Sequence, residues 1–140
     1  MANVVTIQTL QDGPRNVKVK LVGVLDTTGE IAATTLINPA LLGPIDNATG
    51  QLATKLAIKR ITYDVEATIT VHLLWDATAD VTAVTLNGFG EMCFGDTQFL
   101  QNNAGAGVTG IINYSTQADP EPSATNVLSF TVILDLVKQV

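Results

Sequence analysis

The sequence is poor in charged residues, cysteine, histidine and aromatic residues. Charged residues make up 14% of its 140 residues, against about 25% in average chains. This composition excludes a disordered segment and argues against a charge-rich coiled coil. The single cysteine, Cys93, cannot form a disulfide within the chain. Because apolar residues flank it, we expect Cys93 to be a buried, unreactive side chain.

Positive charge is scarcer than negative charge, with 7 basic against 13 acidic residues and a net charge of −6. The short cluster at residues 55–60 alternates with apolar residues, which predicts a solvated strand face rather than a binding patch. Since phosphate contacts need clustered lysine and arginine, we expect no nucleic-acid partner. The basic residues are scattered along the sequence, at Arg15, Lys18, Lys20, Lys55, Lys59, Arg60 and Lys138.

Long apolar runs are absent from the sequence. No segment approaches the roughly 18 consecutive apolar residues of a membrane helix, so we expect no membrane partner. The first residues lack the basic and apolar regions of a signal peptide. The sequence therefore predicts a protein made in the cytoplasm.

The abundant residues, threonine, valine, leucine and alanine, alternate in polarity along much of the chain. In the segment 68–75, Ile69, Val71, Leu73 and Trp75 share one face, as expected for a half-buried strand. Shifts in the apolar pattern predict bulges near Gly23 and Lys59–Arg60, and residues 39–42 are predicted to form one helical turn. Strands are predicted over 4–10, 16–25, 31–37, 52–65, 68–75, 81–86, 89–94, 108–115 and 127–137.

This pattern of short strands separated by turn residues predicts an all-β fold, an antiparallel two-sheet sandwich. The strand number favours a jelly roll of about eight strands. Residues 1–140 have the length of a single domain, in which residues 1–10 form a candidate N-terminal arm.

Catalytic motifs are not found. His72, the single histidine, lies on the polar face of a predicted strand without a nucleophile or an orienting carboxylate beside it. The GxGxxG pattern at 105–110 lacks the preceding strand and following helix of a dinucleotide site. There is no cysteine pair, histidine pair or EF-hand loop for a metal. We therefore expect no enzyme activity, cofactor or metal.

Candidate contact residues lie in the loops and at the N-terminus. The small residues of loop 101–110 allow a partner's backbone to come close, and the apolar residues in loops either bind a partner or cover the core. The N-terminal arm could pair with a neighbouring strand. The candidates are Asn102, Asn103, Gly105 and Gly107 in that loop, Leu41, Leu42, Ile45, Phe99 and Leu100 among the apolar residues, and Val4 and Thr6 in the arm.

Three stretches carry a resemblance to a known family: MANVVTIQTLQDGPRNVKVKLVGVLD, HLLWDATADV and LQNNAGAGVTG. They resemble the small jelly-roll cement, or decoration, proteins of short-tailed bacteriophage heads. The resemblance implies a virion protein, made in the bacterial host cytoplasm, that sits on the outer capsid surface. There it would staple neighbouring major capsid subunits, as a homodimer or a trimer. Loop 101–110 is the part that matches as it stands.

Two other functions remain open from the residues. A head-fibre, tail or adhesion module would bind a surface saccharide through exposed aromatic side chains, but aromatics are few and Trp75 is expected in the core. A cupin-type enzyme would need two or three histidine ligands, and the chain has one histidine.

Overall fold

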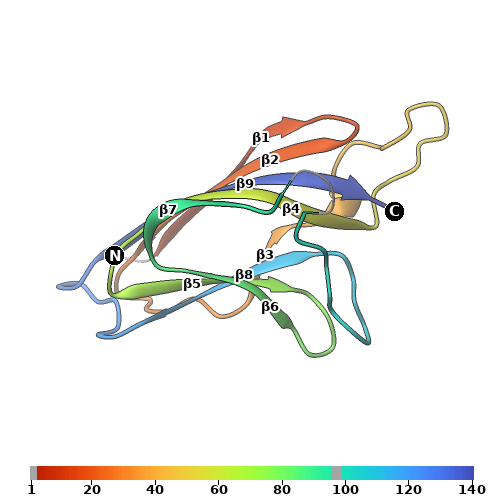
Figure 1. Cartoon of the computed structure of the whole chain (residues 1–140). Coiled ribbons are helices and arrows are strands. Elements are labelled where there is room, and N and C mark those ends of the chain that lie inside the picture. Colours follow the sequence, from red (N-terminus) through yellow and green to blue (C-terminus); the bar gives the residue numbers. More distant parts are fainter. Residues whose placement is uncertain (1–2, 96–98) are drawn as a thin grey trace.

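The computed structural model describes residues 3–95 and 99–140, which form a β-sandwich (Figure 1). A single short 3-10 helix, η1, is present in this part of the chain, where Asn38 caps it by accepting a hydrogen bond from the Ala40 N–H at 3.0 Å. This confirms the predicted helical turn after Asn38. The elements are β1 (Val4–Asp12), β2 (Asn16–Leu25), β3 (Thr34–Ile37), η1 (Pro39–Leu41), β4 (Lys55–Val65), β5 (Ile69–Trp75), β6 (Val81–Leu86), β7 (Gly88–Cys93), β8 (Ile112–Ala118) and β9 (Leu128–Gln139).

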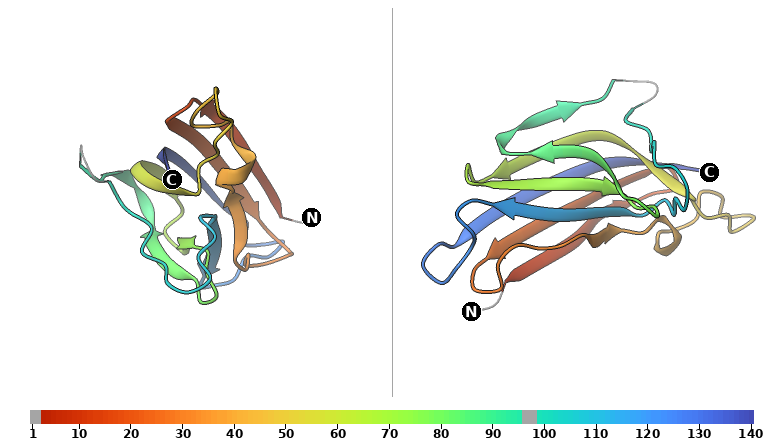
Figure 2. Two further views of the ribbon diagram at one scale, coloured as in Figure 1. Left: turned by 90° about the vertical axis from the view of Figure 1, so that its right-hand side faces the viewer. Right: turned by 90° about the horizontal axis from the view of Figure 1, so that it is seen from below.

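The strands form a five-stranded sheet in the order β1-β2-β9-β4-β7 and a four-stranded sheet in the order β3-β8-β5-β6. All neighbouring strands are antiparallel. Strand β2 pairs with β9, β3 with β8, β4 with β7, and β5 with β6, as in one long hairpin wrapped around a core. This is the jelly-roll order, so the predicted fold is confirmed. Figure 2 shows the two layers from the end and from below.

Strand β1 is an addition to the jelly roll. The predicted N-terminal arm forms most of this strand, which pairs with β2 from Val4 to Asp12. Almost all of its residues are exposed on both faces. It therefore extends the five-stranded sheet beyond the core that the two sheets share.

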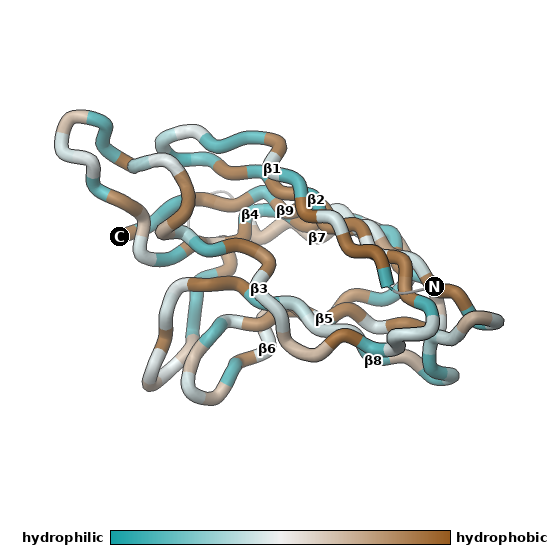
Figure 3. The backbone as a smooth tube through the Cα atoms, turned by 180° about the vertical axis from the view of Figure 1, so that it is seen from behind, coloured by the Kyte–Doolittle hydropathy of each residue, from teal (hydrophilic) through white to brown (hydrophobic). Residues whose placement is uncertain are grey.

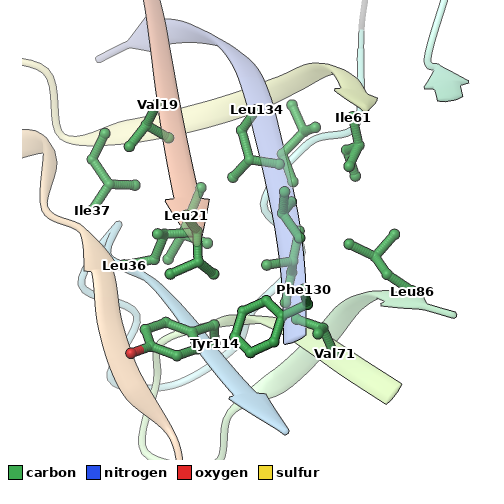
Figure 4. Packing of buried hydrophobic residues seen from close by; sticks show 14 of the residues in the cluster. Val19, Leu21, Leu36, Ile37, Ile61, Val71, Leu86, Tyr114, Phe130 and Leu134 are labelled. Atoms are coloured by element: carbon green, nitrogen blue, oxygen red, sulfur yellow. The ribbon is translucent and has the colours of Figure 1, made fainter. Parts of the chain in front are cut away.

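The core lies between the sheets, because each central strand turns alternate apolar side chains inward (Figure 4). Hydrophobic stretches follow the strands of both layers in Figure 3. The predicted inward face of 68–75 is confirmed: Ile69, Val71 and Leu73 are fully buried and Trp75 is 1% exposed. Sequence alternation alone was enough to place these residues, since a strand's side chains point to opposite faces in turn.

The predicted bulge at Gly23 is wrong, whereas the one at Lys59–Arg60 is confirmed. The β2 register continues through Gly23, which lies opposite Phe130, while the β4 register shifts between Ile58 and Arg60. Gly23 is instead a close-packing position, because a Cβ there would lie 2.4 Å from the Phe130 ring. Register shifts near Thr9 in β1, Thr35 in β3 and Leu73 in β5 were not predicted.

Candidate functional site

Two long loops leave the same end of the sandwich, which also carries the C-terminus (Figures 1 and 2). One joins β3 to β4 and the other joins β7 to β8. We call this end, made of residues 38–54 and the described residues of 94–111, the loop end. All the predicted contact residues except Val4 and Thr6 belong to these two loops, although they come from distant parts of the sequence.

The apolar residues of the β3–β4 loop differ from one another in solvent exposure. Leu41 is 83% exposed, whereas Leu42 is 9% exposed and packs into the core. Ile45 is half-buried and lines a hollow of about 410 Å³ together with Pro14 and Arg15. Leu41 is therefore available to a partner, and Leu42 has almost no surface left to offer one.

A buried ion pair fixes the start of the β3–β4 loop to the five-stranded sheet. The Lys138 side chain is 0% exposed, and its Nζ donates to Asp12 Oδ1 and to the Gly43 carbonyl, each at 2.7 Å. The Gly43 N–H donates to Asp12 Oδ2 at 2.8 Å. Partial burial raises the pKa of Asp12, but the hydrogen bonds from Lys138 and Gly43 and the lysine charge outweigh it and lower that pKa below its usual range.

The β7–β8 loop runs along β4. Leu100 forms a bridge with Ile58, with its N–H and carbonyl bonded to Ile58 at 2.9 and 3.0 Å, and its side chain packs against the core. Phe99 has a φ of 59°, a left-handed conformation that phenylalanine rarely adopts. Leu100 is thus a structural residue in part, which accords with the alternative that these loop residues cover the core.

In the polar part of the β7–β8 loop, the side chain of Asn102 is hydrogen-bonded within the loop itself. Asn102 Oδ1 accepts from the Ala104 N–H at 3.0 Å, while its Nδ2 is buried without a partner. Asn103 and Gly105 are exposed. Nothing lies within 4 Å of a Cβ built at Gly105, so this position is open to a partner.

Gly107 and Gly110 are needed by the fold. Gly107 has a φ of 79°, and a Cβ there would lie 2.1 Å from Thr78 Oγ1; at Gly110 it would lie 2.0 Å from the Thr54 carbonyl. A substitution at Gly107 would thus disturb the loop's own packing against Thr78. Gly105 is the better position at which to test contact with a partner.

Asp76 and Asp80 hold the β5–β6 turn against this loop. Asp76 accepts from Thr109 Oγ1 at 2.6 Å and from Asn113 Nδ2 at 3.0 Å, and Asp80 accepts from the same Asn113 nitrogen at 3.4 Å. Their partners are neutral donors, so the carboxylates serve the structure. Across residues 3–95 and 99–140, no group of three or more His, Cys, Asp and Glu side chains is placed to hold a metal ion.

Val4 and Thr6 lie away from the loop end, on the edge strand β1. Val4 is 57% exposed, as are Ile7 at 42% and Leu10 at 45%. The strand has no charged residue before Asp12. Natural edge strands usually carry charges or proline that block pairing with other chains. Between Val4 and Gln11, strand β1 has a bulge near Thr9 but neither a charged residue nor proline.

The structure corrects the expectation for Cys93, which is exposed. It lies on the outer face of edge strand β7, while the neighbouring residues Met92 and Phe94 pack against the core. A hydrogen bond from its thiol to Glu91 at 3.4 Å, with the charge of Glu91, raises the pKa of Cys93. The thiol is therefore not activated, and the hydrogen bond to Glu91 is the largest cause.

His72 lies on the outer face of β5, opposite Ser115 of β8. Both line a hollow of about 410 Å³ with Glu30, Ile31 and Gln117. No hydrogen bond joins His72 and Ser115 among the interactions of the described residues, so the pair is not arranged as a nucleophile and its base.

Sequence reasoning missed two features of the surface. Phe89, on the edge strand β7, is 85% exposed, and its alternation with glycines gave no signal that it would face solvent. Several of the scattered basic residues share the outer face of the five-stranded sheet, where the register places Lys18, Lys20, Lys55 and Arg60. Strand pairing across the sheet brings them together, and no local pattern in the sequence reports that pairing.

No protein-family model matches the sequence, and a search of curated proteins found no match either. In the part of the chain that the structure describes, no helix has the length and apolar character needed to cross a membrane.

Proposed function

We propose that this protein is a decoration protein that binds the outer surface of an assembled phage capsid and staples neighbouring major capsid subunits. The observation that carries the proposal is the gathering of exposed contact candidates at the loop end, with Leu41 foremost at 83% exposure. Burying an exposed leucine side chain in a partner's pocket removes its apolar surface from water and contributes about 1.5–3 kcal/mol. The jelly roll supplies the rigid support, because the Lys138 pair holds the base of that loop.

A protein that binds only the assembled shell stabilises it by mass action, repeated at every site. This requires no catalytic group, cofactor or metal. The partners are the capsid subunits and a second copy of this chain, and the location is the outside of the virion.

Binding is tested by co-sedimentation with expanded heads that lack the protein, prepared from a phage whose genome encodes it. We expect saturable binding at a fixed ratio to the capsid subunit, and heads that resist heating better once they are covered. The ratio distinguishes dimer sites from trimer sites. Protein that stays at the top of the gradient at every concentration would refute the proposal.

Leu41→Ser sharpens the test. The variant should bind about tenfold or more weakly, because burying a leucine contributes about 1.5–3 kcal/mol. Val127→Ser is the matched control, since Val127 is 51% exposed but lies in the β8–β9 loop at the opposite end. Equal losses in the two variants would contradict the assignment of the loop end to the shell.

A saccharide-binding adhesion module is the second candidate, favoured by the hollow beside His72 and Ser115. Its other polar lining residues, Glu30, Thr116 and Gln117, can donate and accept hydrogen bonds. Saccharide sites usually add an aromatic platform, and no Trp, Tyr or Phe is among the residues that line this hollow. Saturable binding in a glycan screen, lost in Gln117→Ala, would favour this candidate.

A further inference from the structure

Six of the seven basic residues lie on or beside the outer face of the five-stranded sheet. The register places Lys18 of β2 and Arg60 of β4 on either side of Asp135 of β9, so all three point to the outer face. The same alternation places Lys20 and Lys55 on that face, Lys59 lies at the β4 bulge, and Arg15 lies in the β1–β2 turn. We call Arg15, Lys18, Lys20, Lys55, Lys59 and Arg60 the basic face.

The basic face is accessible to a partner. Its central ion pairs, Lys18 to Asp135 at 3.5 Å and Arg60 to Asp135 at 3.6 Å, leave the lysine and arginine side chains 43% and 45% exposed. A single carboxylate thus faces two cations at the centre, and Lys59 and Arg15 are exposed around it. The seventh basic residue, Lys138, is buried in its own ion pair and adds nothing to this surface.

Positive charge is in excess here although the chain carries a net charge of −6. On the same face the register places three carboxylates, Asp135 at the centre and Asp64 and Glu91 toward β7. Many of the other acidic side chains lie in loops at the two ends of the sandwich, at Asp26, Glu30, Asp46, Glu66, Asp76, Asp80, Asp119 and Glu121.

A shallow hollow of about 170 Å³ opens within the basic face. Lys18 and Lys59 line it together with Gln11, Asn16 and Asp135. This is several times the roughly 30 Å³ of one water molecule, so the hollow has room for a side-chain carboxylate beside Lys18 and Lys59. The amides of Gln11 and Asn16 offer further hydrogen-bond donors to it.

The basic face is continuous with the loop end. Lys55 begins β4 directly after the β3–β4 loop, and Arg15 lines the same hollow as Ile45 of that loop. A partner that covers the loop end therefore reaches the basic face without a gap, and negative charge on its surface would complement that face.

We propose that the basic face recognises an acidic patch on the capsid subunits, so that the shell contact extends from the loop end onto the five-stranded sheet. The inference rests on the proposed function and adds the chemistry of the partner, which is a protein surface rich in aspartate and glutamate. Charges at the rim of an interface mainly accelerate association and make it sensitive to salt. The basic face thus steers an otherwise acidic protein into one orientation on the shell.

The experiment measures binding to expanded heads at 50 and 300 mM NaCl. We expect the wild type to bind at least about fivefold more weakly at the higher salt, because a Debye length of about 10 Å at 0.1 M screens exposed charges. Lys20→Gln/Lys59→Gln removes two positive charges and leaves both ion pairs to Asp135 intact. It should lower the affinity at low salt by about fivefold to tenfold.

The matched control is Thr70→Glu/Thr85→Glu, which changes the net charge by the same amount on the outer face of the four-stranded sheet. It should bind like the wild type. Equal losses in the two double variants would show an effect of net charge alone and overturn the inference, as would wild-type binding that ignores salt. In both cases the proposed function stands, whereas wild-type protein that never binds heads refutes the function and the inference together.

Two further measurements would show whether the basic face binds a different partner. Salt-sensitive binding to double-stranded DNA, without binding to heads, would assign the basic face to a nucleic acid and overturn the inference. Salt-sensitive self-association in analytical ultracentrifugation, lost in Lys20→Gln/Lys59→Gln, would assign it to a second copy of the chain and overturn it as well.

Discussion

The two sheets are alike on their inner faces and different on their outer faces. Leu21 and Leu134 of the five-stranded sheet are each 1% exposed, and Val71 and Leu73 of the four-stranded sheet are fully buried. The core therefore draws on the same aliphatic side chains from both layers. Burial of this kind is what folding requires of either sheet.

The outer faces diverge in charge. The four-stranded sheet has no Asp, Glu, Lys or Arg in any of its strands, whereas the five-stranded sheet carries the basic face and three carboxylates. Soluble proteins usually spread charges of both signs over their surfaces. Burial in the core does not require this difference between the outer faces, so it directs attention to what each face contacts.

The five-stranded sheet also differs by the charge that it buries. Asp12→Ala should lower the free energy of unfolding by about 3 kcal/mol. The substitution removes the carboxylate that pairs with the buried Lys138 ammonium and leaves that ammonium its hydrogen bond to the Gly43 carbonyl. Urea denaturation measures this loss. Lys138→Met in the Asp12→Ala background should recover part of it, since the unpaired charge is then gone. A loss below about 1 kcal/mol would show that the pair is unimportant for stability.

Close packing at Gly23 is the second feature confined to the five-stranded sheet. Gly23→Ala should cost about 2 kcal/mol, because its Cβ would lie 2.4 Å from the buried Phe130 ring and overpacking of this kind costs about 1–3 kcal/mol. Gly105→Ala is the control, since its Cβ meets nothing within 4 Å. Equal thermal stability of Gly23→Ala and the control would mean that Phe130 moves aside freely.

Local sequence patterns predicted the inner faces and failed where contacts join distant segments. The alternation in 68–75 placed Trp75 in the core because a strand's period of two can be read from neighbouring residues. Cys93 was misplaced because its flanking residues do not reveal that β7 is an edge strand with its outer face exposed. The phase shift near Gly23 suggested a bulge, although Val24 is simply an apolar residue on the outer face.

In the candidate site, too, local patterns predicted some features and missed those that depend on contacts between distant segments. The sequence identified Leu41 as an apolar loop residue, but it could not separate it from the buried Leu42. The six cations of the basic face come from a turn and two strands, and strand β9 lies between those strands. Only the pairing of β2, β9 and β4 brings Lys18 and Arg60 to the same Asp135. Arrangements of this kind require the topology, which the composition does not contain.

Acid should weaken the five-stranded sheet through Asp12. The pKa of this carboxyl is lowered in the folded protein, so its contribution is present above its unfolded value near pH 4 and is lost as the pH falls through the folded value. The stability advantage of the wild type over Asp12→Asn should therefore shrink between pH 6 and pH 3. Urea denaturation across this range measures it. A constant difference between the two proteins would contradict a depressed pKa.

The smallest effect is expected on the outer face of the four-stranded sheet. Thr85 is exposed opposite His72, and Thr85→Lys should change the free energy of unfolding by no more than about 0.5 kcal/mol, as is usual for surface substitutions. Lys20→Thr on the five-stranded sheet is the reverse exchange and should be equally mild. If Thr85→Lys instead costs more than about 1 kcal/mol, folding itself excludes charge from this face. The contrast between the outer faces would then be a property of the fold, and it would carry no information about what each face contacts.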